Sequence, residues 1–164
     1  MTQTPEAPSD EPPRSPTGSD DLLDAFLANF AAVQYLIVQY LSEHLVDCAR
    51  SMEGDLDQVL ILAILGQRQI DLLQGKGDGS MTSSRLSDVS GLPRETIRRK
   101  LSRMADRGWV VQVKGGGWNI AVDGDGRSRV GRELADLDIR GVRRMARLVR
   151  ALRPYDPTEQ KPAP

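Results

Sequence analysis

Apolar residues recur every three or four positions over several stretches of the chain, which is the spacing of amphipathic helices. The longest of these stretches are 20–48, 55–74 and 130–152. Asp20 and Asp55 stand at the start of the first two, where a carboxylate side chain can cap a helix. The pattern therefore predicts one long continuous helix near the N-terminus, a second helix after it and another long helix near the C-terminus.

A pair of shorter helices is predicted in the middle of the chain. A short helix over 84–90 leads to Gly91, which tolerates the positive φ of a turn, and a longer helix begins at Pro93. This longer helix has apolar residues at spacings of four and three, namely Ile97, Leu101 and Met104. Its other side is rich in arginine. A short helix, a glycine turn and a longer helix with a basic outer face are typical of a helix-turn-helix.

Two stretches of alternating apolar and polar residues follow, at 109–113 and 118–122. They flank the glycine triplet at 115–117, which suits a tight turn. The sequence therefore predicts a two-stranded hairpin, the wing of a winged helix. We expect Trp109 and Trp118 to pack this hairpin against the helices, because a tryptophan here is more often a core residue than a platform for bases.

Charge is unevenly distributed along the chain, although the formal net charge is only -1. Residues 1–84 contain 4 basic and 13 acidic side chains, whereas residues 85–153 contain 17 basic and 8 acidic ones. A basic half joined to an acidic half is expected when one face must meet a polyanion. With a single cysteine and a single histidine, a disulfide framework, a zinc finger and most nucleophile-plus-base catalysis are excluded.

Two further features of the sequence allow more than one interpretation. His44 and Cys48 lie one helical turn apart, a spacing that can hold a metal, but we interpret these two residues as buried interface residues. We expect no metal, no cofactor and no enzymatic activity. The last helix carries a series of arginines: Arg140, Arg143, Arg144, Arg147, Arg150 and Arg153. They either form a solvated face with some ion pairs to the acidic half, or they contact phosphates. Both alternatives remain open at this point.

The composition of the two ends differs from that of the middle. Residues 1–19 hold five of the ten prolines and 154–164 are also polar and proline-rich, so both are predicted to be disordered. The folded part is divided into an N-terminal helical dimerisation part over 20–74, a DNA-binding part over 82–122 and a C-terminal helix over 123–153. This makes the predicted fold mainly α, a winged helix-turn-helix with long N- and C-terminal dimerisation helices and a two-stranded β wing.

The first helix has no charge between Asp24 and Glu43, a length at the lower limit of a membrane span. Polar residues such as Asn29 and Gln34 interrupt that stretch, and no basic cluster flanks it. We therefore expect a cytoplasmic protein without a membrane partner, in which this helix is buried against its own domain and a second copy of the chain.

The middle of the chain resembles known transcription regulators. The stretch LPRETIRRKLSRMADRGWV is similar to the recognition helix of Crp/Fnr regulators, and GLPRETI is its most specific part. The order of long helix, helix, helix-turn-helix, wing and terminal helix instead resembles the MarR family, in which a Thr-x-x-Gly-Arg segment follows the wing. Here only Gly126 and Arg127 match that segment, and the Asp-Arg-Arg pattern usual in the wing is absent.

This resemblance implies a homodimeric regulator that binds double-stranded DNA. Three residues of the helix after Pro93 are expected to read bases: Arg94, Glu95 and Arg99. Four more are expected to hold the DNA backbone: Thr96, Arg98, Arg103 and Lys114. The alternative is a winged-helix module that docks an acidic protein and binds no DNA. If a small-molecule effector exists, we expect it between the first two helices and the partner subunit.

Overall fold

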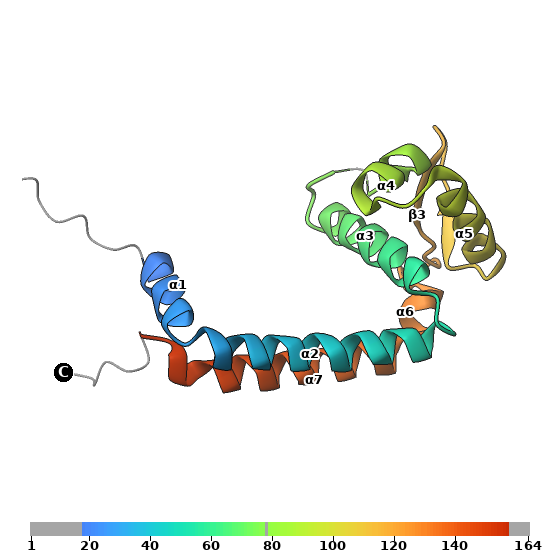
Figure 1. Cartoon of the computed structure of the whole chain (residues 1–164). Helices are drawn as coiled ribbons and strands as arrows, with labels where there is room; N and C mark the ends of the chain where they lie inside the picture. Colours follow the sequence, from blue (N-terminus) through green and yellow to red (C-terminus); the bar gives the residue numbers. More distant parts are fainter. Residues whose placement is uncertain (1–17, 78, 158–164) are drawn as a thin grey trace, which may run out of the picture. The chain divides into compact units, whose positions relative to one another are not determined.

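The computed structural model describes residues 18–77 and 79–157, which are mainly helical with one small antiparallel sheet (Figure 1). These residues form two compact units. The larger unit is Gln39–Arg147, and the other contains the residues up to Val38 together with those from Leu148 onward. Of the two predicted disordered ends, 1–17 and 158–164 lie outside the described residues.

The N-terminal part is two helices and not the single continuous helix that the apolar spacing predicts. α1 spans Gly18–Ala28, α2 spans Phe30–Ser51, and their axes are bent by 96° at Asn29. The Asn29 side-chain amide donates to the carbonyl oxygen of Ala25 at 2.9 Å, in the last turn of α1. Its own carbonyl oxygen accepts from the amide of Val33 at 3.1 Å, in the first turn of α2. Asparagine thus closes one helix and opens the next, because its short amide competes for backbone hydrogen bonds.

None of the described helices is by itself long and apolar enough to cross a membrane, and only α1 and α2 taken together reach that composition.

α3 spans Leu56–Leu73 and begins as the sequence predicts. The Asp55 side chain caps it by accepting from the backbone amide of Gln58 at 3.2 Å. The chain leaves the helix at Gly75, whose φ of +71° is readily adopted by glycine.

α4 and α5 confirm the predicted pair of shorter helices and the turn between them. α4 spans Ser83–Ser90, Gly91 follows with a φ of +72°, and α5 spans Arg94–Asp106. The carbonyl oxygen of Pro93 accepts the first hydrogen bond of α5, so proline stands one position before the helix. The Ser87 hydroxyl donates to the carbonyl oxygen of Leu92 at 2.6 Å and ties the turn to α4.

The sheet has one more strand than the predicted hairpin. β2 (Val110–Gln112) and β3 (Gly117–Ile120) pair antiparallel as expected, but β1 (Met81–Thr82) pairs with the other edge of β3. Met81 lies opposite Trp118 in the register. A two-residue strand is too short to show alternation in the sequence, which is why β1 was not predicted.

The C-terminal helical part is also interrupted, contrary to the single helix predicted over 130–152. α6 spans Arg129–Glu133, Leu134 follows it, and α7 spans Ala135–Leu152. A short 3-10 helix, η1, continues from Arg153 to Tyr155, so the chain stays ordered in regular structure just beyond the predicted end of the folded part.

The core of the larger unit gathers residues from α3, α4, α5, the sheet and α6. Seven of its side chains are almost completely enclosed: Ile61, Leu65, Leu86, Ile97, Leu101, Met104 and Trp109. The three predicted core residues of α5 are among them. Because this core fixes one side of α5, the opposite side of the helix faces outward.

Candidate nucleic-acid interface

α5 separates its residues into a buried side and an exposed basic side. Ile97, Leu101 and Met104 are fully buried. Five charged residues of the same helix are exposed, which are Arg94, Glu95, Arg98, Arg99 and Arg103. Thr96 is half-buried. The structure thus brings six of the seven predicted contact residues onto one helix.

Within this group Glu95 and Arg98 are already paired with each other. Arg98 donates from Nε to Glu95 Oε2 at 3.0 Å and from Nη2 to Glu95 Oε1 at 2.8 Å. The hydrogen bonds and charge of Arg98 lower the pKa of the Glu95 carboxyl from its usual value. Both side chains are about three-quarters exposed, so this pair is readily exchanged for other partners.

Three arginines of α5 are not engaged in this way. Arg94, Arg99 and Arg103 are exposed and form no ion pair with any residue that the structure describes. Guanidinium groups held on a rigid helix with their donors unoccupied are suited to bidentate contacts with guanine or phosphate.

The seventh predicted residue, Lys114, is exposed in the turn between β2 and β3. Gly115 and Gly116 follow with φ of +96° and +83°, values that favour glycine. The Val113 amide donates to the carbonyl oxygen of Gly117 at 2.8 Å and closes the turn. The glycines therefore position a short turn with a single cationic side chain.

Trp109 is a core residue, as predicted, and half-buried Trp118 packs against the same core. The Trp109 indole donates to Glu133 Oε2 at 2.8 Å, and the Arg107 guanidinium lies 3.9 Å from the ring centroid. The hydrogen bonds from Arg129 and then from Trp109 lower the pKa of the Glu133 carboxyl. Both tryptophans therefore contribute to the core, as expected.

Lys100 is a residue of α5 that sequence reasoning missed. It is only 8% exposed, and its ammonium forms an ion pair with Asp55, the cap of α3. Lys100 stands three residues after Ile97 and one before Leu101. This spacing in the sequence indicates that it lies on the buried side of the helix.

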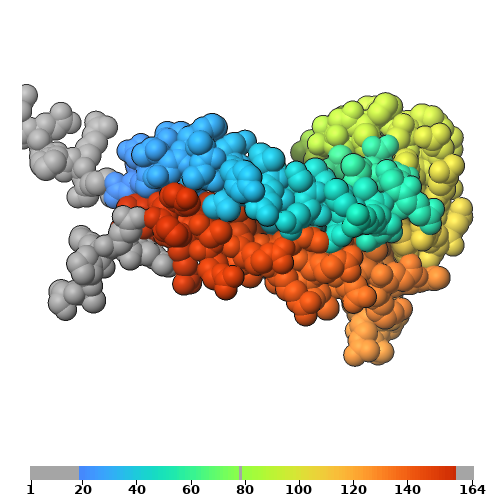
Figure 2. Space-filling view, turned by 60° about the horizontal axis from the view of Figure 1, so that its bottom comes forward, coloured from blue at the N-terminus to red at the C-terminus, as the bar shows by residue number. Residues whose placement is uncertain are grey.

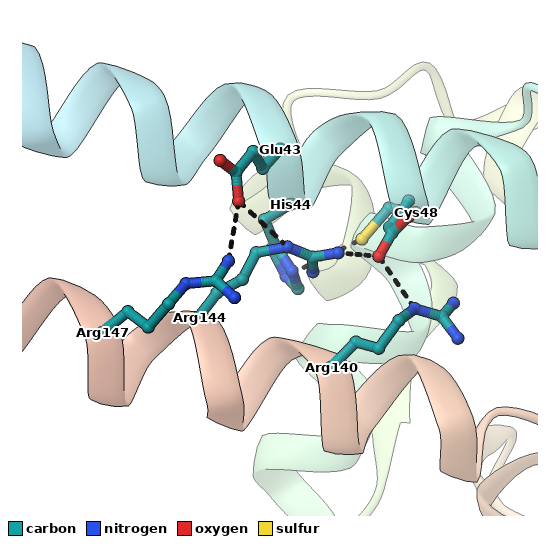
Figure 3. A network of polar contacts seen from close by, with 7 residues as sticks. Glu43, His44, Cys48, Arg140, Arg144 and Arg147 are labelled. Atoms are coloured by element: carbon teal, nitrogen blue, oxygen red, sulfur yellow. Dashed lines mark hydrogen bonds and ion pairs between the residues drawn. The ribbon is translucent and has the colours of Figure 1, made fainter.

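Three arginines of α7 form ion pairs with α2. Within the larger unit the two helices lie side by side, as Figures 1 and 2 both show. Arg140 and Arg144 pair with Asp47, and Arg147 pairs with Glu43 at 3.0 Å (Figure 3). Arg144 also lies 3.6 Å from Glu43. Pairing with the acidic half is therefore confirmed for these three arginines.

The remaining arginines of α7 differ. Arg143 and Arg150 are exposed and form no ion pair with described residues, so phosphate contact stays open for them.

His44 and Cys48 lie beside this ion-pair network (Figure 3). The His44 ring stacks on Tyr40 with the centroids 5.9 Å apart, and its Nε2 atom is 3.7 Å from Cys48 Sγ. Cys48 is buried, and desolvation together with the charge of Asp138 raises the pKa of its thiol. A protonated, enclosed thiol is a poor nucleophile and a poor metal ligand.

A cavity of about 540 Å³ opens next to these residues. It lies between α2, α3 and the segment from α6 to α7, all within the larger unit. Its walls are mainly apolar, with contributions from Met52, Leu62, Ile70, Val130, Leu134 and Leu137.

Comparison with protein-family models, curated proteins and solved structures finds no match to this chain.

Proposed function

We propose that this chain is a sequence-specific DNA-binding transcription regulator that acts as a homodimer and has a winged helix-turn-helix. In this proposal α4 and α5 are the helix-turn-helix and β2 and β3 are the wing. The observation that carries it is the outer side of α5, where Arg94, Arg99 and Arg103 are exposed and form no ion pair with residues 18–77 or 79–157, while the core fixes the opposite side. A rigid helix with cationic donors on one side fits the width of a major groove.

Base reading is assigned to the N-terminal half of α5. Arg94 and Arg99 would donate in bidentate fashion to guanine, and Glu95 would accept from the amino group of cytosine. The Glu95–Arg98 ion pair is compatible with this division of roles, because both side chains are exposed and can exchange each other for DNA groups. On binding, Arg98 would exchange part of this contact for a phosphate.

The backbone contacts are assigned to Thr96, Arg98, Arg103 and Lys114. Phosphate contacts set the register of a protein on the duplex and make its affinity depend on salt. Lys114 belongs to the wing turn and the other three belong to α5. Arg143 on α7 remains a further candidate for phosphate contact.

The homodimer is assigned to α2 and α7, which expose more large apolar side chains than a monomer in water commonly does. On α2 these include Tyr35 and Leu45, and on α7 they include Val142, which is 70% exposed. Charge also favours a second copy of the chain, because Asp21 and Asp24 on α1 are acidic whereas Arg143 and Arg150 on α7 are basic. A two-fold dimer uses the same surface twice, so both helix faces would be covered.

Selection of binding sites from random duplex DNA, followed by salt titration on the selected site and on a scrambled duplex, tests the proposal. Recovery of one recurrent motif, bound much more tightly than the scrambled duplex, is expected. A selection that recovers no motif would overturn DNA recognition and favour the alternative in which the basic side of α5 docks an acidic protein.

A further inference from the structure

Lys100 is a cation on the helix proposed to read DNA, yet it points into the protein. Its side chain is about one-tenth exposed, whereas Arg98 on the same helix is about three-quarters exposed. Its ammonium donates to Asp55 Oδ2, and Asp57 Oδ2 is 3.8 Å away. Because the Asp55 carboxylate holds the buried ammonium at the start of α3, the charge of Lys100 is turned away from the exposed side of α5 that would meet a phosphate.

Asp55 is the centre of a small network at the start of α3. Besides the ammonium of Lys100, its carboxylate accepts from the backbone amide of Gln58 and, at 2.6 Å, from the Gln58 side chain. Desolvation would raise the pKa of the Asp55 carboxyl, but the hydrogen bonds from Lys100 and Gln58 outweigh it and lower the pKa. One carboxylate therefore caps α3 and holds α5.

The same carboxylate stands at the end of the turn that joins α2 to α3. In this turn Glu53 has a φ of +53°, which is uncommon outside glycine, and Gly54 has a φ of +85°. The amide of Gly54 donates to Ala49 at 2.7 Å and the amide of Asp55 donates to Met52 at 2.9 Å. The turn is thus fixed in one conformation, and Lys100 attaches α5 to it.

We propose that Lys100 is a positioning residue. Its ion pair with Asp55 attaches α5 to the α2–α3 turn and so sets the orientation in which α5 meets DNA. This inference rests on the proposed function. Since α2 is assigned to the dimer interface, the ion pair links the helix of that interface to α5. It would therefore help to fix the distance between the α5 helices of the two copies in the dimer. The desolvation of a buried ion pair offsets much of its attraction, so such a pair adds little to net stability and can still favour one geometry.

The test compares three variants of the full chain. Lys100→Met keeps a chain of similar length without the charge, and Asp55→Asn removes the charge but keeps a good helix cap. Asp57→Asn is the matched control, because the Asp57 carboxylate is 3.8 Å from the ammonium, beyond hydrogen-bond distance, is more exposed than Asp55 and does not cap α3. Circular dichroism establishes the temperature at which all three are folded.

Amide hydrogen exchange without DNA is the first measurement. Faster exchange over 94–106 in both Lys100→Met and Asp55→Asn, and not in Asp57→Asn, is expected because the ion pair no longer holds α5. Unchanged exchange in these two variants would overturn the attachment, whether or not the chain binds DNA.

DNA binding is the second measurement. In both variants the affinity for the selected site should fall about tenfold, within the range shown by coupled neighbouring residues, with an unchanged salt slope. Adding one base pair between the half-sites should reduce the DNA affinity of both variants less than it reduces the affinity of the wild type, because α5 is held less firmly in the variants. A salt slope lowered by about one in Lys100→Met alone would make Lys100 a phosphate contact and overturn the proposal.

The two measurements separate the two claims. Wild-type protein that selects no site, with the exchange effect present, refutes the proposed function and keeps the attachment. Wild-type protein that selects a site that both variants bind equally well refutes the positioning role and keeps the proposed function.

Discussion

The indole nitrogen of Trp109 donates to Glu133 Oε2 at 2.8 Å and joins the residue before β2 to the last residue of α6. Since Trp109 is only 2% exposed, truncating its side chain leaves an empty volume in the core. We predict that Trp109→Ala lowers the free energy of unfolding by about 3 to 5 kcal/mol, mainly through the cavity that it leaves. Urea unfolding followed by circular dichroism measures this, and Trp118→Ala, at a half-buried position, should cost clearly less. Equal losses would show that the core is not centred on Trp109.

Removing a base contact should reduce the affinity for the selected site only, whereas removing a phosphate contact should reduce the affinity for any duplex. Arg94→Ala or Arg99→Ala should weaken binding to the selected site by about 1 to 3 kcal/mol with much less effect on scrambled DNA. Arg103→Ala or Lys114→Ala should weaken both and lower the salt slope by about one. Fluorescence anisotropy at several salt concentrations gives both quantities. Proportional losses in all four variants would mean that α5 is only an electrostatic surface.

The proposed dimer depends on apolar surface that α7 exposes. Val142→Glu should convert the dimer to a monomer, because a charge in the middle of an apolar interface loses its hydration without gaining a partner. Sedimentation at micromolar concentration measures the mass. Val89→Glu, at an exposed apolar position of α4, is the control and should remain dimeric. Wild-type protein that sediments as a monomer would remove the dimer from the proposal.

Acid should weaken the contact between α3 and α5. The pKa of the Asp55 carboxyl is lowered in the folded chain, so its contribution to stability is complete above the ordinary carboxyl pKa of about 4 and is lost as the pH falls further. Urea unfolding at pH 7 and at about pH 3 should show a smaller loss on acidification in Asp55→Asn than in the wild type. An identical loss in the two proteins would mean that Asp55 has no lowered pKa.

Cys48 should be unreactive in the folded protein. Its pKa is raised by desolvation and by Asp138, and its sulfur is enclosed, so both the thiolate fraction and access are low. A chromogenic disulfide reagent should therefore react slowly with native protein and rapidly in denaturant. Rapid reaction in the native state would show that this part of α2 opens.

The sequence was most informative where local chemistry alone determines the backbone. The segment from Ser83 to Asp106 follows the prediction closely, because Gly91 permits the positive φ of the turn, Pro93 restricts the residue before α5, and Ile97 fixes the buried side of α5. Asp55 likewise caps α3 as predicted.

Prediction failed where several interactions compete. Asn29 occurs within an unbroken helical spacing, and nothing in that spacing indicates that its amide would turn back to Ala25. β1 exists only because β3 lies beside it, which is a tertiary effect. The sequence does not indicate the ion pair of Lys100, because a lysine on a basic helix is expected to be exposed and its partner Asp55 is distant in the sequence.

The ion pairs between α2 and α7 also change how the charge of the chain acts at a distance. Glu43 and Asp47 neutralise much of the positive potential of Arg140, Arg144 and Arg147, although these arginines belong to the basic half of the sequence. Among the arginines over 140–147 only Arg143 forms no ion pair with a described residue, whereas Arg94, Arg99 and Arg103 of α5 all form none. If the chain binds DNA as proposed, the ion pairs between α2 and α7 would favour an approach of the polyanion toward α5, besides joining two helices.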